Sequence, residues 1–465
     1  MRKLKAAVSL ITATAATGLT FHAFDPNSLS DDILHGVVRS SRAISTIALT
    51  AVDYKLTLRG LPVDSDEYRG KLSEVHSRSA WRILKLCEAN KGFYVKAGQF
   101  VAALRQVPKE YSSTLSSLQD QVQYPGLEQQ MKLDTTTMYF ISKSITWFFP
   151  EYRFGWLVAE FVQAISLELD FIQEAGNSER TARNFKNNKW IKVPRVFWDL
   201  TTKQVLTMEF CTGHKVDDVD YLKERKIDPV KVAKVLLEMF AEMIFIHGFV
   251  HGDPHPGNIL VSPEGQNGFS LVLLDHGIYK QLDDKFRLDY CQLWKALILL
   301  DSKKLQHLGE QFGVAKYSKY FPVIFTGRTV DSTSALGKGM SIEERSKLKQ
   351  ELKSLKMEDI SSFMESLPSD FLTILRTDGL LRSIASKLGA SQRVRILLYA
   401  KYALYGLSPN LNPEYDFAIK VKFSQLMAYV SYLQLRLILE LLSWIAKVKQ
   451  LLFSLYGKIG AVLVV

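Results

Sequence analysis

The stretch FIHGFVHGDPHPGNILVSPEGQNGFSLVLLDHG, residues Phe245 to Gly277, decides the fold of this chain. Just upstream, apolar residues recur every three or four positions from Val232 to Ile244, which is typical of one buried helical face. Asp228 followed by Pro229 indicates where that helix begins, because Asp caps helix N-termini and Pro is tolerated at the first helical position. We therefore expect a rigid helix that leads into the polar loop at 251–258.

Two short runs of β-forming residues, 259–262 and 269–274, flank the turn-forming sequence PEGQNG. This pattern predicts a β-hairpin. Asp253 and Asn258 precede its first strand, and Asp275 follows its second strand. Asp253 and Asn258 are therefore expected at one end of the hairpin and Asp275 at the other, with the three side chains close together in space.

The spacing His-x-Asp-x-x-x-x-Asn, then a hairpin, then Asp-x-Gly follows the catalytic plan of protein kinases. In that plan Asp253 is the candidate base, which accepts the proton of the attacking hydroxyl. Asn258 and Asp275 are the candidate metal ligands, which hold Mg²⁺ against the phosphates. The alternative is a polar turn that only caps a helix and a hairpin. The joint pattern, with the correct elements in between, favours phosphoryl transfer.

Composition places the chain among ordinary globular proteins. Its 465 residues are 47% hydrophobic and 23% charged, which is enough for a two-lobed core with helical additions. The net charge of +11 is spread along the sequence, without the basic cluster and interleaved aromatic residues of a nucleic-acid-binding module. We expect no nucleic-acid partner, and the charge fits an anionic membrane surface better. Cys87, Cys211 and Cys291 are far apart, which argues against disulfides and zinc.

The first 24 residues contain Arg2, Lys3 and Lys5, many small residues, and no acidic residue before Asp25. This composition is typical of a mitochondrial targeting segment. A weak membrane anchor or a secretory signal remains open for the same residues. Residues 25–125 are predicted to form a helical extension.

Two pairs of polar residues follow helical spacing. Lys96 and Gln99 lie one turn apart on a predicted helix, where a solvated pair is the simpler alternative. Residues 161–177 are predicted to form one helix, on which Asp170 and Glu174 share a face. Like charges so placed repel each other slightly, so this acidic face is expected to meet a basic partner.

Four motifs together resemble the UbiB/aarF-domain-containing atypical kinase family. They are KAGQ at 96–99, ELD at 168–170 followed by Glu174-Ala175-x-Asn177, HGDPHPGN at 251–258, and DHG at 275–277. Antibiotic and choline phosphotransferases also carry such a loop but lack the first two motifs. The phrases KVPRVFWDL at 192–200 and VLTMEF at 205–210, with the leader and the C-terminal length, are similar to the aarF-domain-containing kinase 1 branch.

The resemblance implies an α+β, protein-kinase-like fold with a helical N-terminal extension and a mostly helical C-lobe. It also implies Mg²⁺ and ATP as cofactors. The cofactor-binding positions that it implies are Lys96, Gln99, Glu168, Asp170, Glu174, Glu209 and Cys211. The first two would belong to a helix that covers the nucleotide pocket, and the next two would hold that helix. Glu174 would pair with the ATP-anchoring lysine, and Glu209 to Cys211 would reach the adenine.

The sequence departs from this family between Gln99 and Glu168. An intact kinase N-lobe needs a phosphate-covering loop and a strand that carries the anchoring lysine. Residues 109–130 and 132–149 instead have helical patterns. Lys132 and Lys143, set in those patterns, are poor substitutes for the anchoring lysine. We therefore predict an incomplete N-lobe.

The predicted organisation is a leader (1–24), the helical extension with KxGQ (25–125), a residual N-lobe (126–212), a kinase-like C-lobe (213–412) and C-terminal hydrophobic and basic helices (413–465). Three functions stay open: a catalytically impaired kinase-like protein, an active ATP-dependent phosphotransferase or ATPase, and a membrane-associated scaffold. The resemblance implies a mitochondrial protein near the inner membrane, with a role in lipid or quinone homeostasis. A lipid or a small molecule is the expected substrate.

Overall fold

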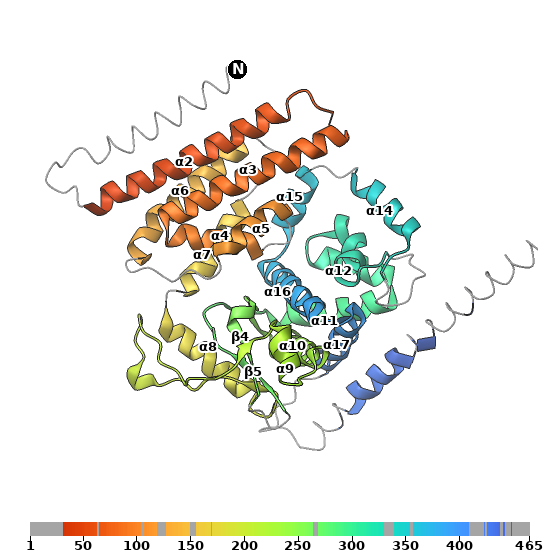
Figure 1. Ribbon diagram of the computed structural model, residues 1–465. Coiled ribbons are helices and arrows are strands. Elements are labelled where there is room, and N and C mark those ends of the chain that lie inside the picture. Colours follow the sequence, from red (N-terminus) through yellow and green to blue (C-terminus); the bar gives the residue numbers. More distant parts are fainter. Residues whose placement is uncertain are drawn as a thin grey trace, which may run out of the picture. The chain divides into compact units, whose positions relative to one another are not determined.

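The computed structural model contains two compact units, Met1–Leu169 and Asp170–Val465 (Figure 1). It describes residues 31–62, 65–103, 107–118, 127–148, 155–168, 170–263, 268–329, 339–353, 357–408, 423, 426–437, 440–441 and 448. The predicted leader at 1–24 and most of the predicted C-terminal helices at 413–465 lie outside these residues. No helix among the described residues is long and apolar enough to cross a membrane.

Every regular element that the structure describes in the first unit is a helix. Its elements are α2 (Asp31–Thr57), α3 (Asp66–Asn90), α4 (Phe93–Ala103), α5 (Lys109–Leu115), η1 (Ser116–Leu118), α6 (Leu127–Phe148) and α7 (Gly155–Glu168). Ser65 begins α3, because its hydroxyl accepts the backbone N–H of Tyr68 at 3.0 Å. The predicted helical character of this region is therefore confirmed.

The core of the first unit forms where α3, α4 and η1 approach closely. Phe93, Leu115 and Leu118 are completely buried there. Gly98 makes this approach possible, since a Cβ at that position would lie 2.4 Å from Leu118 Cδ1. A buried ion pair adds to the packing, with Arg39 Nη2 2.5 Å from Asp134 Oδ2.

The second unit begins with α8 (Phe171–Asn184) and contains two small sheets. The larger sheet has the order β1-β5-β4-β2, formed by Ile191–Lys192, Ser270–Leu273, Ile259–Ser262 and His214–Lys215. Its β1 and β5 are parallel, and its other pairs are antiparallel. The smaller sheet pairs β3 (Phe249–His251) with β6 (Tyr279–Gln281) in antiparallel fashion. The predicted hairpin is confirmed as β4 and β5.

Helices form the rest of the second unit. They are α9 (Val219–Glu224), α10 (Pro229–Ala241), α11 (Asp284–Leu299), α12 (Ser302–Gln311), α13 (Phe321–Thr326), α14 (Ile342–Lys353), α15 (Met357–Ser366), α16 (Ser369–Lys387) and α17 (Gln392–Gly406). Short 3-10 turns are η2 (Trp198–Leu200), η4 (Pro256–Asn258) and η5 (Ala315–Tyr320), and η3 (Glu242–His247) is a π-turn. Asp228 caps α10, with Pro229 at its first position, as predicted. The α+β fold class is confirmed.

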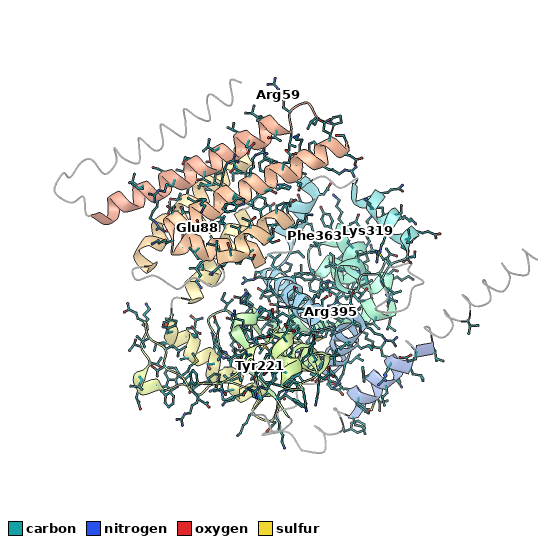
Figure 2. The ribbon with its side chains drawn as sticks, in the orientation of Figure 1. Arg59, Glu88, Tyr221, Lys319, Phe363 and Arg395 are labelled. Carbon is teal, nitrogen blue, oxygen red and sulfur yellow. The ribbon has the colours of Figure 1, made fainter. Side chains whose placement is uncertain are left out.

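A buried ion network holds the helical part of this unit together. Arg395 of α17, labelled in Figure 2, lies with Nη1 2.8 Å from Asp378 Oδ1 of α16. Arg382 reaches the same carboxylate at 2.5 Å. Burial opposes ionisation of Asp378, but the two guanidinium groups prevail and lower its pKa. The network fixes α16, which also borders the candidate site.

Candidate functional site

The helix α10 does not stop abruptly but widens into the π-turn η3 before the site begins. This widening leaves the carbonyl oxygen of Phe245 available, and Arg287 Nη1 donates to it at 2.9 Å. The following Gly248 has φ of 59°, a conformation that favours glycine, and it redirects the chain into β3. The start of the polar loop is therefore set by the packing of buried helices.

Strand pairing then brings the loop and the DHG segment together. His251 lies opposite Tyr279 in the smaller sheet, and Gly252 N donates to Ile278 O at 2.9 Å. In the hairpin, Leu274 N donates to Asn258 O at 2.9 Å. The residues that follow β3 and precede β4 therefore lie beside those that follow β5.

The structure places the three predicted catalytic residues in this junction. Asn258 Nδ2 donates to the backbone oxygen of Asp253 at 3.1 Å, so this loop is closed on itself. Gly277 N donates to Asp275 Oδ1 at 2.9 Å. The side chain of Asp253 is half-buried, and that of Asp275 is exposed. The convergence of the three residues agrees with the expectation from the hairpin; their chemical roles remain predictions.

The helix α8 holds the DHG segment by its backbone. Glu174 Oε1 accepts the backbone N–H of His276 at 3.0 Å, and Asn177 Nδ2 donates to the backbone oxygen of the same residue at 3.0 Å. Both backbone polar groups of His276 are thus bound by one helix face, which stabilises one conformation of residues 275–277. Asn177 was part of a motif in the sequence, but its contact was not predicted.

The prediction of one continuous helix over 161–177 is wrong. The helix α7 ends at Glu168, and Asp170 is the N-cap of α8, accepting the backbone N–H of Ile172 at 3.0 Å. A carboxylate that caps the next helix offers the backbone an alternative to helical continuation. Asp170 and Glu174 therefore do not form an acidic helix face: one caps α8 and the other binds His276.

The two histidines of the site are buried and neutral. His276 Nε2 lies 3.1 Å from the backbone oxygen of Leu273, so this nitrogen carries the proton, and Nδ1 lies 3.0 Å from the Tyr279 hydroxyl, from which it accepts. Burial, with a smaller contribution from the neighbouring His251, lowers the pKa of His276 to about 3. Burial also lowers the pKa of His251, against the opposing charges of Asp275 and Asp253. His251 Nδ1 accepts the backbone N–H of Asp253 at 3.0 Å.

The helix α16 supplies a residue that the sequence did not indicate. Arg376 Nη2 lies 3.6 Å from Asp253 Oδ1, and the guanidinium is largely buried. One turn of helix before it, Thr373 faces Gly252, whose added Cβ would lie 3.8 Å from Thr373 Cγ2. The ordinary kinase loop has Arg directly before its Asp, whereas here Gly252 occupies that position. The guanidinium beside Asp253 therefore comes from a distant helix.

Glu209 and Cys211, the residues predicted to reach the adenine, lie near Lys192 of β1, an edge strand of the larger sheet. Glu209 Oε1 forms an ion pair with Lys192 Nζ at 2.8 Å, and Glu209 N donates to Arg195 O at 2.8 Å. The contact with Lys192 holds the pKa of Glu209 below its ordinary value. Cys211 is a half-buried thiol without a disulfide. These contacts position the segment that precedes β2. Its contact with adenine remains a prediction.

The remaining predicted site residues belong to the first unit. Lys96 and Gln99 lie one turn apart on α4, and Gln99 Nε2 donates to Leu118 O at 2.7 Å. Glu168 is the last residue of α7. Among the residues that the structure describes, no three His, Cys, Asp or Glu side chains are grouped as ligands of one metal ion.

Comparison with known proteins agrees with this geometry. A family model, the ABC1 atypical kinase-like domain, matches residues 114–309. The AarF domain-containing protein kinase 1 of Mus musculus is 34% identical over 450 residues, covering 83% of this chain and 84% of that protein. The AarF domain-containing kinase 1 of Drosophila melanogaster is 33% identical, covering 82% of this chain and 84% of that protein.

A solved structure, the complex of Rv3197 with erythromycin from Mycobacterium tuberculosis, is similar with a TM-score of 0.40 and 19% identity, covering 59% of this chain and 68% of that chain. The sequence relatives decide the assignment, because they match most of both chains at more than 30% identity. The chain belongs to the ABC1 atypical kinase-like family, in the branch of the AarF domain-containing protein kinase 1 proteins.

Proposed function

We propose that this chain is a kinase-like protein that keeps the Mg²⁺ and catalytic loops of its family but is impaired in phosphoryl transfer. The observation that carries the proposal is the contrast between two regions. The loop at 251–258 and the DHG segment converge and are held by hydrogen bonds. The described residues from 109 to 168, by contrast, are helices and turns, where a kinase N-lobe would have strands.

The donor atoms of the retained loop fit Mg²⁺. Asn258 uses its amide nitrogen for Asp253 O, which leaves the amide oxygen as the ligand atom. Asp275 accepts Gly277 N with one oxygen and offers the other. Mg²⁺ prefers oxygen ligands and is bound by one or two protein side chains together with substrate phosphates. When bound, the ion would neutralise phosphate charge, while Asp253 would orient the acceptor hydroxyl and take its proton.

Two further observations support the proposal that the N-lobe is incomplete. Large apolar side chains lie exposed in the segment that precedes β2: Leu200, the last residue of η2, is 62% exposed, and Phe210 is 89% exposed. Such exposure is unusual for large apolar side chains that a neighbouring lobe covers. In addition, the alignment with the mouse relative runs over 450 positions but includes only 83% of the 465 residues of this chain, which is fewer than 450. The other positions are gaps in this chain. Part of the relative therefore has no counterpart in this chain.

Loss of the loop and the lysine would remove the groups that position the α- and β-phosphates. Electrostatic stabilisation and orientation supply most of the rate in phosphoryl transfer, so their loss lowers turnover by several orders of magnitude. An active phosphotransferase is the second candidate, and the hydrogen bonds that hold the backbone of Asp253 and His276 favour it. We further propose that the protein is mitochondrial, which the composition of residues 1–24 supports. Its proposed substrate is a lipid, a quinone or a small molecule.

Calorimetry with MgADP on the full chain tests the proposal. The impaired form is expected to show no binding in the micromolar range, because the phosphate-covering loop is missing. Micromolar, Mg²⁺-dependent binding that disappears in the Asp275→Asn variant would support the active phosphotransferase instead. Asp289→Asn, in α11 outside the site, serves as the control for a general effect of removing one carboxylate.

A further inference from the structure

Two helices of the second unit, α11 and α17, bring four large side chains together. Tyr290 and Trp294 belong to α11, and Arg395 and Tyr399 belong to α17. Among the described residues these are the four largest fully buried side chains, and we call them the α11–α17 cluster. In each helix the two members are four residues apart and share one face. The ring centroids of Trp294 and Tyr399 lie 5.0 Å apart, and Arg395 Cζ lies 5.7 Å and 5.4 Å from them.

Every member of the α11–α17 cluster carries a buried polar atom that forms no hydrogen bond within the described residues. These atoms are the hydroxyl oxygens of Tyr290 and Tyr399, Nε1 of Trp294 and Nε of Arg395. The indole and guanidinium N–H groups can only donate, and the two hydroxyls can also donate. Buried donors are almost always paired, because an unpaired one has lost its hydrogen bonds to water. Four such donors in one cluster indicate a ligand that accepts hydrogen bonds.

The four donors lie close enough to influence one another. Burial, together with the charge of Asp378, raises the pKa of Tyr290 and that of Tyr399 well above the ordinary value. The indole of Trp294 and the guanidinium of Arg395 oppose this rise in the pKa of Tyr290. Arg395 has the same effect on the pKa of Tyr399. Both hydroxyls therefore keep their protons, and they remain donors beside the other two.

The charges around the α11–α17 cluster are predominantly positive. The buried Arg395 and the partly buried Arg382 share the carboxylate of Asp378, so two guanidinium groups face one acid. Arg287 of α11 is also buried, and its ion-pair partner Asp284 is exposed. Excess buried charge destabilises a fold unless an opposite charge lies nearby. A negatively charged ligand would therefore be held here by charge as well as by hydrogen bonds.

We propose that the α11–α17 cluster is a binding site for a small monovalent anion, with chloride as its ligand. The side chains of Trp294, Arg395, Tyr290 and Tyr399 would each donate to the ion. Because the site is fully buried among large side chains, a spherical halide fits it better than a phosphate or a carboxylate. A water molecule accepts two hydrogen bonds and has no charge, so it would satisfy only part of the donors. The anion would tie α11 to α17, and this role does not depend on phosphoryl transfer.

Thermal unfolding of the full chain in mixtures of sodium chloride and sodium gluconate, at constant ionic strength, tests the proposal. Gluconate is a large carboxylate that we expect to stay outside the buried site. Replacing gluconate with chloride should raise the unfolding midpoint of the wild type by about 2–4 °C, and the rise should saturate as it does for one binding site. Sodium bromide should act like sodium chloride.

The double variant Tyr290→Phe, Tyr399→Phe removes two of the four donors and keeps both rings. It should need about tenfold more chloride for half of the rise, because two hydrogen bonds to the ion are lost. The two salts also differ in their general effect on stability, so the site-specific part is the difference between the wild type and this variant. Tyr94→Phe is the matched control, because it removes a buried hydroxyl of the first unit that also forms no hydrogen bond within the described residues. The neighbouring Arg39 is neutralised by Asp134, so this control should respond to chloride as the wild type does.

Bromide locates the ion without any variant. Wild-type crystals grown in sodium bromide should show an anomalous diffraction peak within hydrogen-bonding distance of Trp294 Nε1 and Arg395 Nε. The proposal is overturned if the folded double variant, checked by circular dichroism, responds to chloride as the wild type does. It is also overturned if no anomalous peak lies in the α11–α17 cluster, a result that would assign the four donors to water.

Discussion

Acidification should destabilise the second unit through His276. This imidazole is neutral in the fold, since burial lowers its pKa from 6.5 to about 3. The unfolded chain gains a proton near pH 6.5, whereas the folded chain does not, so protonation favours unfolding as the pH falls below that value. Between pH 7 and pH 5 the loss from this one residue is about 2 kcal/mol.

Urea unfolding at pH 7 and pH 5 measures this loss, and His276→Phe isolates it. Phenylalanine keeps the ring but cannot titrate, so the difference in unfolding free energy between the two pH values should shrink by about 2 kcal/mol. The part that remains includes His251, whose pKa burial also lowers. Tyr279→Phe is the matched control, because it removes a hydroxyl that bonds to His276 but leaves the imidazole.

The control should lower stability by about 1 kcal/mol at both pH values and keep the wild-type difference between them. The reasoning is refuted if His276→Phe keeps the full pH difference. It is also refuted if Tyr279→Phe abolishes that difference, because the titrating group would then not be the imidazole.

Two further predictions concern packing and buried charge. Gly98→Ala should cost about 1–3 kcal/mol, because its methyl group would overlap a core side chain 2.4 Å away, whereas Gly70→Ala, with nothing within 4 Å, should be neutral or stabilise by about 0.5–1 kcal/mol in thermal melts. Asp378→Asn should cost about 3–5 kcal/mol in urea unfolding, because it leaves the buried Arg395 and the partly buried Arg382 without a carboxylate. Asp359→Asn removes an exposed ion pair and should cost less than about 1 kcal/mol. If Gly98→Ala and Gly70→Ala, or Asp378→Asn and Asp359→Asn, lowered the stability equally, the result would contradict the prediction, which rests on the difference in burial.

The parts of the site that sequence could predict are those with local signals. Asp228 and Pro229 marked the start of α10, and the PEGQNG turn between two β-rich runs marked the hairpin. Once both are known, the convergence of Asp253, Asn258 and Asp275 follows from strand geometry. No long-range information was needed for this step.

The helix break before Asp170 was missed although a local signal was present. Asp170 has Gln173 three residues later, which resembles the capping-box spacing of a helix start. The helical spacing of Asp170 and Glu174 is a competing signal, because it also fits one continuous helix face. Sequence periodicity alone therefore joined two helices, because α7 and α8 are separated by only a few residues.

The contacts of Arg376, Asn177 and the π-turn had no comparable signal. Arg376 reaches Asp253 from a helix far along the chain, and only the packing of α16 on the loop brings them together. Asn177 binds the backbone of His276, and a backbone partner leaves no trace in the partner's side chain. Such contacts depend on tertiary structure, so a single sequence does not contain them.

The most direct test of the central claim is ATP turnover by the purified full chain with Mg²⁺. Phosphate release should be compared among the wild type, Asp253→Asn and Asp275→Asn, with the Mus musculus relative as a reference. We predict that the wild-type rate equals that of both variants, because an incomplete nucleotide lobe, as proposed, would leave the retained loops without turnover. A wild-type rate well above both variants would contradict it and show that this chain transfers phosphate.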